Sequence, residues 1–367
     1  MQMGHADPIG FALSPAGVAV RVQACATSAP VRVGLLLNAR ARRLRRGRDR
    51  EALAELLPEA HAVVETPDLA SVRRALATLL CVRGANVLAV AGGDGTVHHA
   101  VNALLELSRE AELLTGVRPP LPRLLILNGG TLNIVGRTIA IHGPPRTTLH
   151  RFLRYFDAIP LSRLPARRLP LLEVRWGETA AFAPRFGFVF GSEAAFHAIE
   201  LYGRFGAGYV GLSRFLYEFA RGALAGSELW RAESWKLGPF HTPLRIDGQR
   251  FLPYSGVVAS TVDLTLVIAA IRTIRRPLLE PGFAARVVHE TDPARLVRLL
   301  PALMTERSAP GIADFPRAHR MDLFGPYTLD GECFSEPAFG SERLPLTVTL
   351  SEERLHAVPG DFTAEQW

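Results

Sequence analysis

Three glycines and one aspartate stand where an apolar run gives way to a helical pattern. The segment VLAVAGGDGTVHHAVNALLEL begins at Val87. Directly after its apolar start come Gly92, Gly93, Asp94, Gly95 and Thr96. A simple turn needs one or two glycines, whereas a loop that presses its backbone against a ligand can need three. Because backbone N–H groups at the start of a helix attract anions, such a loop favours a phosphate group.

A second turn of the same kind follows the next predicted strand. The apolar run Leu124–Leu127 leads into Gly129, Gly130 and Thr131. The carboxyl ends of parallel strands meet at one edge of a sheet, where open α/β sheets bind ligands. One glycine turn is explained equally well as a tight strand–helix connection. Two consecutive turns favour a phosphate site.

The known short phosphate loops do not fit these turns. The pattern G-x-x-x-x-G-K-[ST] is absent, and the one lysine of the chain, Lys236, lies far from both turns. The dinucleotide pattern G-x-G-x-x-G fails because His98 takes the place of its third glycine. The sequence therefore argues against a P-loop nucleotide hydrolase and against a dinucleotide-binding turn at this position.

Strand and helix patterns alternate around these turns. Buried-strand patterns end at Asn38, at Thr66, before Gly92 and before Asn128, and helical patterns lie between them. This alternation predicts a parallel sheet that is covered by helices on both faces. The arginine-rich stretch ARARRLRRGRDR, residues 39–50, follows the first strand, and we interpret it as a solvated surface beside the proposed phosphates that is also suited to touch a membrane.

The pattern changes after His142–Arg146. Short strand-like runs bounded by glycine, proline and aspartate then predominate, which predicts a mostly antiparallel second domain. A chain of 367 residues is also too long for one ordinary core. We predict four parts: a disordered extension (1–30), a nucleotide-binding α/β domain (31–150), a β-rich domain (151–355) and a tail (356–367). We also predict hinge motion between the two domains near Gly143–Arg151.

Composition limits the possible partners and compartments. Residues are 48% hydrophobic and 21% charged, which is typical of a folded globular protein. The formal net charge is +7, and all but one of the 42 basic residues are arginine, so an acidic partner is expected. Three distant cysteines without a Cys-x-x-Cys pair predict a reducing, cytoplasmic compartment. No apolar stretch approaches the roughly 18 residues of a membrane-spanning helix.

Two stretches carry a family resemblance. GGDGTVHHAVNA and NGGTLNIVGRTI resemble the two nucleotide-binding motifs of the diacylglycerol kinase catalytic superfamily, which includes bacterial soluble lipid kinases and sphingosine and ceramide kinases. The resemblance extends over Val31–Leu350 and implies the two-domain fold shared by NAD kinases and diacylglycerol kinases. NAD kinases also have GGDGT. The second stretch, GTLN followed by Arg137, is more similar to the lipid enzymes.

The resemblance implies a nucleotide site that binds ATP with Mg²⁺. By position in the two motifs and at the ends of the first two strands, its residues are Asn38, Thr66, Gly92, Gly93, Asp94, Gly95, Thr96, Val97, His98, Gly130, Thr131 and Asn133. Asp94 would lie near the magnesium ion that accompanies ATP. Because neighbours on a helix point apart, we expect His98 to face the nucleotide loop and His99 to face solvent.

A late Asp-Gly-Glu is the third feature of the resemblance. Asp330, Gly331 and Glu332 match it, and the resemblance implies that Asp330 or Glu332 is the catalytic base. By its residues alone, LDGE between strand-like runs is a hairpin turn. IDGQ at Asp247 is the same turn without the glutamate, and we interpret Asp247 as structural.

The activity implied is that of an ATP-dependent lipid kinase. Its substrate would be a hydroxylated lipid such as diacylglycerol, ceramide or a sphingoid base, met at the inner face of an anionic membrane. Apolar residues of 187–196 and 212–220 are candidates for an acyl pocket, or for ordinary core. An NAD kinase-like enzyme and a non-catalytic nucleotide- or membrane-binding regulator are the alternatives. No nucleic-acid recognition motif occurs, and a homodimer is compatible with the sequence.

Overall fold

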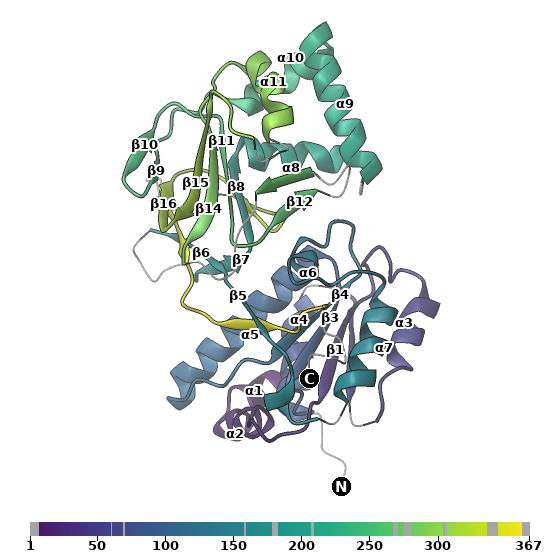
Figure 1. Cartoon of the computed structure of the whole chain (residues 1–367). Coiled ribbons are helices and arrows are strands. Elements are labelled where there is room, and N and C mark those ends of the chain that lie inside the picture. The colour runs from purple at the N-terminus through teal and green to yellow at the C-terminus, as the bar shows by residue number, and fades with distance from the viewer. Residues whose placement is uncertain are drawn as a thin grey trace. The chain divides into compact units, whose positions relative to one another are not determined.

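The chain forms two compact units, drawn in Figure 1. The computed structural model describes residues 7–361, apart from positions 60, 69, 158, 304 and 306 and segments 178–182, 207–208, 267–270, 275–280 and 336–343. The first unit combines Met1–Leu169 with Leu355–Trp367, and the second is Pro170–Arg354. The chain therefore passes between the units twice.

A six-stranded sheet forms the centre of the first unit, in the order β2-β1-β3-β4-β20-β5. Four parallel strands begin it: β1 (Val33–Asn38), β2 (Ala62–Thr66), β3 (Val87–Gly92) and β4 (Arg123–Asn128). Nearly all residues of β1, β3 and β4 are buried, as expected for parallel strands covered on both faces. The predicted parallel α/β sheet is confirmed.

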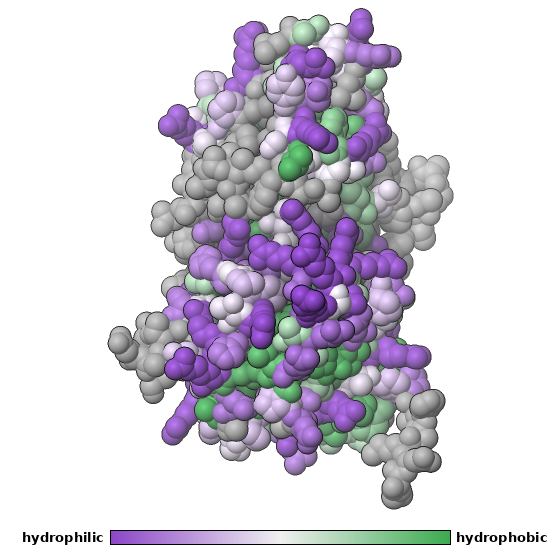
Figure 2. Space-filling model, turned by 90° about the vertical axis from the view of Figure 1, so that its right-hand side faces the viewer, coloured by the Kyte–Doolittle hydropathy of each residue, from purple (hydrophilic) through white to green (hydrophobic). Residues whose placement is uncertain are grey.

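Helices cover both faces of this sheet (Figure 1). On one face, α3 (Gly47–Ala54) and α7 (Pro145–Phe156) contribute Leu53, Leu149 and Phe152 to a core cluster with β1 and β3. Figure 2 looks onto the side that carries these two helices, where strongly hydrophilic residues gather. The remaining helices of the unit are α1 (Pro8–Ala12), α2 (Pro15–Ala24), α4 (Ala70–Ala77), the π-helix η1 (Thr78–Val82), α5 (Asp94–Thr115), α6 (Ile134–Thr138) and the 3-10 helix η2 (Leu161–Arg163).

The described strands of the second unit form two six-stranded antiparallel sheets and a two-stranded one, β12-β13. One six-stranded sheet has the order β10-β9-β16-β19-β6-β7 and the other β15-β14-β11-β8-β17-β18. Side chains of both sheets, among them Val174 and Phe190, make up one core cluster, so the sheets pack face to face. The predicted antiparallel second part is confirmed.

The elements of the second unit are short. Its strands are β6 (Leu172–Trp176), β7 (Arg185–Gly187), β8 (Val189–Glu193), β9 (Leu244–Ile246), β10 (Gln249–Phe251), β11 (Gly256–Ser260), β12 (Leu264–Leu266), β13 (Ile271–Ile274), β14 (Phe283–Val288), β15 (Ile312–Ala318), β16 (Arg320–Leu323), β17 (Tyr327–Leu329), β18 (Glu332–Phe334) and β19 (Leu346–Leu350). Its helices are α8 (Ala194–Arg204), α9 (Tyr209–Ala225), α10 (Glu228–Glu233), the 3-10 helix η3 (Ser234–Leu237) and α11 (Pro293–Leu303).

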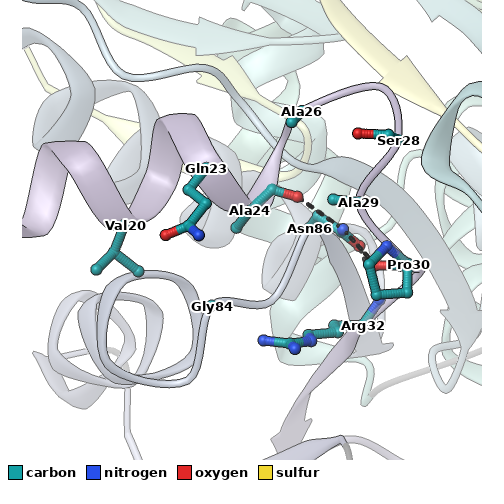
Figure 3. A pocket seen from close by; sticks show the side chains of 10 residues that line it. All are labelled: Val20, Gln23, Ala24, Ala26, Ser28, Ala29, Pro30, Arg32, Gly84 and Asn86. Atoms are coloured by element: carbon teal, nitrogen blue, oxygen red, sulfur yellow. Dashed lines mark hydrogen bonds between the residues drawn. The ribbon is translucent and has the colours of Figure 1, made fainter.

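The N-terminal segment is folded where it is described, in contrast to the predicted disordered extension. Figure 3 shows how the buried Asn86 holds it: its Nδ2 donates to the carbonyls of Ala24 (2.8 Å) and Pro30 (2.9 Å). The guanidinium of Arg21, on α2, donates to the carbonyl of Pro120 at 2.9 Å. These partners are distant in sequence, so the local composition of residues 1–30 could not reveal them.

The first division between the units, after Leu169, differs from the predicted boundary at 150, whereas the second, after Arg354, lies within one residue of the predicted 355. The amphipathic helix α7 packs into the core of the first unit, so the predicted hinge at Gly143–Arg151 lies inside that unit. The segment β5 (Arg167–Leu169) pairs with β20 (Leu355–Ala357), which also pairs with β4. The predicted C-terminal tail thus contributes a strand to the first sheet. Any hinge between the units belongs at the two crossings, Leu169–Pro170 and Arg354–Leu355.

We predict that the first unit loses stability below about pH 6.5 because of His61. Its imidazole is buried, its Nδ1 accepts from the Val33 N–H at 3.2 Å, and burial lowers its pKa, an effect that Asp157 only partly offsets. The unfolded chain therefore binds a proton first as the pH falls, and the free energy of unfolding decreases with it. Urea unfolding followed by circular dichroism at several pH values measures this. His61→Asn keeps an acceptor for Val33 and should flatten the dependence; an equally steep curve in that variant would contradict the assignment.

Candidate functional site

The carboxyl ends of four neighbouring strands bring the predicted residues to one edge of the first sheet. Asn38 lies opposite Thr66 in the β1–β2 register, and Gly92 lies opposite Asn128 in the β3–β4 register. The two glycine turns continue directly from β3 and β4. The structure therefore gathers the predicted nucleotide residues of the first unit at the edge where ligands bind in open α/β sheets.

The two glycine turns pack against each other, backbone to backbone. The N–H of Gly129 donates to the carbonyl of Gly92 at 2.7 Å. A Cβ added to Gly130 would lie 2.4 Å from the Cα of Gly93, and one added to Gly129 would lie 3.1 Å from the Cα of Gly92. The glycines are thus required first by the contact between the turns, and that contact fixes the shape of the surface offered to a ligand.

Asn38 and Thr96 link β1 to the first glycine turn. The Asn38 Nδ2 donates to the Thr96 Oγ1 at 2.8 Å, and the Asn38 Oδ1 accepts from the Arg40 N–H at 2.9 Å. A Cβ on Gly92 would lie 2.3 Å from the same Thr96 oxygen. Thr66 is buried and donates its hydroxyl to the carbonyl of Leu37 at 3.0 Å. Asn38 therefore positions the first glycine turn, whereas Thr66 holds the end of β1.

Helix α5 begins at the first glycine turn. Its N-cap is Gly93, so no side chain caps it, and its first intrahelical bond runs from the Val97 N–H to the Gly93 carbonyl at 3.1 Å. The preceding N–H groups of a helix have no intrahelical partner, and the helix dipole places partial positive charge there. Gly93, Asp94 and Gly95 are half-buried. This helix start is a suitable binding surface for phosphate oxygens.

Asp94 and Asn133 join the two turns. The Asp94 Oδ1 accepts from the Val135 N–H, at the start of α6, at 3.3 Å. Asn133 closes the second turn, because its side chain accepts from the Gly130 N–H at 3.0 Å and donates to the Gly130 carbonyl at 3.1 Å. Thr131 lies between them and is half-buried. Asp94 therefore has a structural contact in addition to the magnesium role predicted for it.

The structure buries His98 and partly buries His99. The ring of His98 meets the ring of His99 edge to face, with 5.2 Å between centroids. His99 is half-buried, so it does not face solvent freely. Asn102 donates to the His98 carbonyl at 2.9 Å, one turn along the helix. Val97 is likewise buried, and both residues belong to the packed face of α5.

Sequence reasoning missed Asn128 and Gly136. The buried Asn128 ends β4 and donates from its Nδ2 to the carbonyl of Ile141 at 2.8 Å. A Cβ on Gly136 would lie 2.2 Å from the Asn128 Oδ1. Only a glycine at this position of α6 therefore leaves space for the side-chain amide of Asn128. The sequence did contain one indication of Asn128, because it is an asparagine at the end of a buried-strand pattern, as Asn38 is.

In the second unit, the Asp-Gly-Glu segment is the hairpin turn that its residues predicted. Leu329 pairs with Glu332 across β17 and β18, and both Asp330 and Gly331 have positive φ, at 54° and 90°. The Asp330 Oδ1 accepts from the N–H groups of Phe188 and Val189, each at 2.9 Å. The Asp330 carboxylate therefore fixes the neighbouring β7–β8 connection.

Asp247 provides a direct comparison. It occupies the equivalent turn between β9 and β10, also with positive φ, and its carboxylate accepts from the N–H groups of His319 and Arg320. The structural interpretation of Asp247 is consistent with these bonds, and Asp330 makes the same kind of contact. Glu332 has no counterpart in the other turn, where Gln249 follows.

An apolar cavity of about 230 Å³ lies in the second unit. Its walls come from α8, α9, α11 and the strands β11 and β14, and they include Ala195, Ala198, Phe215, Phe219 and Val257. Parts of the two segments predicted as acyl pocket or core therefore line this mostly apolar, partly open space. Within the described residues, no helix is both long and apolar enough to traverse a bilayer.

Glu193, next to this cavity, was also missed. It ends β8 with φ 57° and ψ −118°, an unusual backbone conformation for a residue with a side chain, and it is buried. Its Oε1 accepts from the Thr242 hydroxyl at 3.0 Å. Burial raises the pKa of the nearby Tyr254, and the Glu193 carboxylate raises it further. Nothing in a Gly-Ser-Glu-Ala stretch predicts such a conformation.

Comparison with known proteins assigns the first unit. Residues 32–157 match the family model described as the diacylglycerol kinase catalytic domain. This segment belongs to the diacylglycerol kinase catalytic superfamily. The resemblance found in the two glycine motifs is thereby confirmed, and it supports ATP as the phosphate donor. No curated protein matches the sequence.

Solved structures show the fold of the whole chain. Two structures of candidate diacylglycerol kinases from Bacillus anthracis str. Sterne have TM-scores of 0.59 and 0.58 at 14% identity. A third structure, of a diacylglycerol kinase from the same organism, has a TM-score of 0.55 at 13% identity. Each alignment covers 89% of this chain and 96% of the other. The diacylglycerol kinase-like two-domain fold is confirmed.

We predict that Gly130→Ala opens the contact between the two turns. The added Cβ meets backbone rather than a movable side chain, so the substitution should cost about 1–3 kcal/mol of local stability and weaken ATP binding. Hydrogen exchange of peptides from β3 and α5, with ATP titration, measures both effects. Gly47→Ala is the control, because a Cβ there has no neighbour closer than 3.8 Å. Unchanged exchange and ATP affinity in Gly130→Ala would show that the turns do not need this close approach.

Proposed function

We propose that this protein is an ATP-dependent lipid kinase that transfers the γ-phosphoryl group to the hydroxyl of a membrane lipid. The observation that carries the proposal is the pair of glycine turns at the carboxyl edge of a diacylglycerol kinase catalytic domain. The candidate acceptors are diacylglycerol, ceramide and sphingoid bases. The apolar cavity of the second unit suits an acyl chain, and the positive net charge suits an anionic membrane surface.

The chemistry of the first unit fits ATP with Mg²⁺. The start of α5 offers backbone N–H groups to phosphate oxygens, and the carboxylate of Asp94 lies half-buried at that start. Oxygen ligands are those that Mg²⁺ prefers, and one or two carboxylates with substrate phosphates commonly suffice. Among the described residues no group of three or more His, Cys, Asp or Glu is arranged to hold a metal. These donors fit an Mg²⁺ ion that would be held mainly by the ATP phosphates, with Asp94 as an additional ligand. When bound, the ion would neutralise negative charge on the phosphoryl group that is transferred.

The residues of the chain have distinct tasks in this mechanism. The glycine turns and the first N–H groups of α5 hold and orient the phosphates, which is most of what a loose phosphoryl transfer requires. Asn38, Thr96 and Asn133 keep the turns in shape. His98 acts through packing, since its ring is buried.

We assign the proton acceptor to Glu332. Asp330 is committed to two backbone N–H groups, as Asp247 is in the equivalent turn, and it orients the hairpin that presents Glu332. The lipid oxygen forms a bond to the γ-phosphorus, the bond from that phosphorus to the β–γ bridging oxygen breaks, and the hydroxyl proton goes to Glu332. General-base assistance of this type contributes about 10²–10⁴-fold to the rate.

The test is transfer of labelled γ-phosphate from ATP to a panel of diacylglycerol, ceramide, sphingoid base and NAD. We expect label in one of the lipids, a loss of about 10²–10⁴-fold in Glu332→Gln, and a strong loss in Asp94→Asn. Asp247→Asn is the matched control and should retain activity. Asp330→Asn keeps an acceptor oxygen for Phe188 and Val189 and should retain most of it.

Other outcomes would revise the proposal. Label in NAD would assign an NAD kinase-like activity. Binding of ATP without transfer to any acceptor would favour a non-catalytic nucleotide- or membrane-binding regulator. Loss of activity in Asp330→Asn with full activity in Glu332→Gln would move the base to Asp330.

We further predict that Ala198→Phe selectively impairs long-chain lipids. The added ring fills the apolar cavity, so the KM for a long-chain acceptor should rise about tenfold or more, while a short-chain acceptor is little affected. ATP affinity and the unfolding temperature should stay close to wild type, because the cavity is empty space within the second unit. Equal effects on both chain lengths would place the acyl chain elsewhere.

A further inference from the structure

A recess of about 480 Å³ in the first unit is lined by five arginines and a single acidic residue. Arg42, Arg43, Arg46 and Arg48 come from the arginine-rich stretch after β1, Arg146 comes from the start of α7, and the acidic residue is Asp49. None of the residues predicted to bind the nucleotide lines this recess. Its size is that of a small-molecule pocket.

The charges in this arginine recess are not neutralised by the protein. Within the described part of the chain, none of the five guanidinium groups has a hydrogen bond or an ion pair, although each is exposed and carries a full charge. Asp49 likewise forms no ion pair with a described residue. Other arginines of the unit do find carboxylates, as Arg50 does with Glu65 at 3.5 Å and Arg73 with Glu110.

Two helices begin at the recess, and neither has a side-chain cap. The N-cap of α3 is Arg46 and that of α7 is Pro144, and neither residue accepts a hydrogen bond through its side chain. The positive end of a helix dipole disfavours cations and favours anions. At these two helix starts the chain places Arg46, Arg48 and Arg146, and Asp49 is the one acidic residue in their first turns. Positive charge therefore exceeds negative charge at these helix starts, and an anion bound there would be stabilised.

The recess is a built feature of the fold. Leu44 and Leu53 are buried beneath it, which holds the arginine-rich stretch against the sheet. The backbone N–H of Arg43 donates to the carbonyl of Gly129 at 3.1 Å, so the stretch is tied to the second glycine turn. Pro144 and Pro145 also line the recess. The hydrophilic residues that gather on this side of the unit are visible in Figure 2.

We propose that the arginine recess is a second anion site, which binds a phosphomonoester or polyphosphate group. The planar guanidinium fork matches phosphate oxygens in pairs of hydrogen bonds, and several arginines together favour an anion with more than one charge. Such a group is carried both by soluble polyphosphates and by the headgroup of a lipid phosphomonoester. The site shares no lining residue with the proposed nucleotide site and does not depend on which substrate the enzyme phosphorylates.

The experiment is calorimetric titration of the full chain with sodium tripolyphosphate at physiological ionic strength. The pocket variant is Arg46→Gln/Arg146→Gln. The control variant is Arg74→Gln/Arg83→Gln, which removes the same charge from two exposed arginines outside the recess. We expect the pocket variant to bind about tenfold more weakly or worse, and the control variant to bind like wild type.

A second arm identifies the source of the phosphate. Wild type and both variants are sedimented with phosphatidylcholine vesicles that contain phosphatidic acid, a phosphomonoester, or the same charge of phosphatidylglycerol, a diester. Binding to phosphatidic acid that only the pocket variant loses would assign a lipid headgroup. Pocket-dependent binding of tripolyphosphate alone would assign a soluble anion.

Either result supports the site. Tripolyphosphate binding that is equal in all three proteins would place the anion at the glycine turns and overturn the proposal. Absence of tripolyphosphate binding together with equal sedimentation of wild type and the pocket variant would also overturn it. Neither readout requires kinase activity, so failure of the proposed lipid kinase function would be seen separately in the transfer assay.

Discussion

The contact between the two glycine turns is the constraint on which the functional edge of the first unit depends. A Cβ on Gly130 would lie 2.4 Å from the Cα of Gly93, and a Cβ on Gly93 or Gly129 would lie 3.1 Å from backbone of the facing turn. Because β3 and β4 are adjacent and parallel, the turns that follow them must share this narrow space. The start of α5 and the start of α6 are then held together by Asp94. The surface that we propose for phosphate binding results from packing between the two turns.

The arginine-rich stretch depends on the same constraint. It leaves β1 beside the second turn, to which the Arg43 N–H binds, and it then wraps over Leu44 before α3 begins. Its arginines are thereby concentrated at the start of two helices instead of being spread over the surface. Positive charge from side chains and positive charge from helix dipoles therefore coincide on one side of the unit.

The second unit contains the same Asp-Gly hairpin turn twice, and comparing the two turns distinguishes the residues that the turn itself needs from the residue proposed for catalysis. Asp247 and Asp330 both adopt positive φ, and both accept two backbone N–H groups from a neighbouring strand. The aspartate is needed by the turn and by the strand beside it. The two hairpins differ in the residue that follows Asp-Gly, which is Gln249 in one and Glu332 in the other. This difference is the reason to place the chemistry on Glu332.

The sequence by itself determined the elements whose signals are local. Continuous apolar runs specified β1, β3 and β4, the glycine motifs specified the turns after β3 and β4, and Asp-Gly specified both hairpins, because in each case the deciding atoms belong to neighbouring residues. Only the tertiary structure decided that residues 8–24 fold against α4 and η1, that β20 joins the sheet from the far end of the chain, and that His98 is buried. The same holds for Asn86, Asn128 and Glu193, since their partners are distant in sequence and no pattern within a few residues records them.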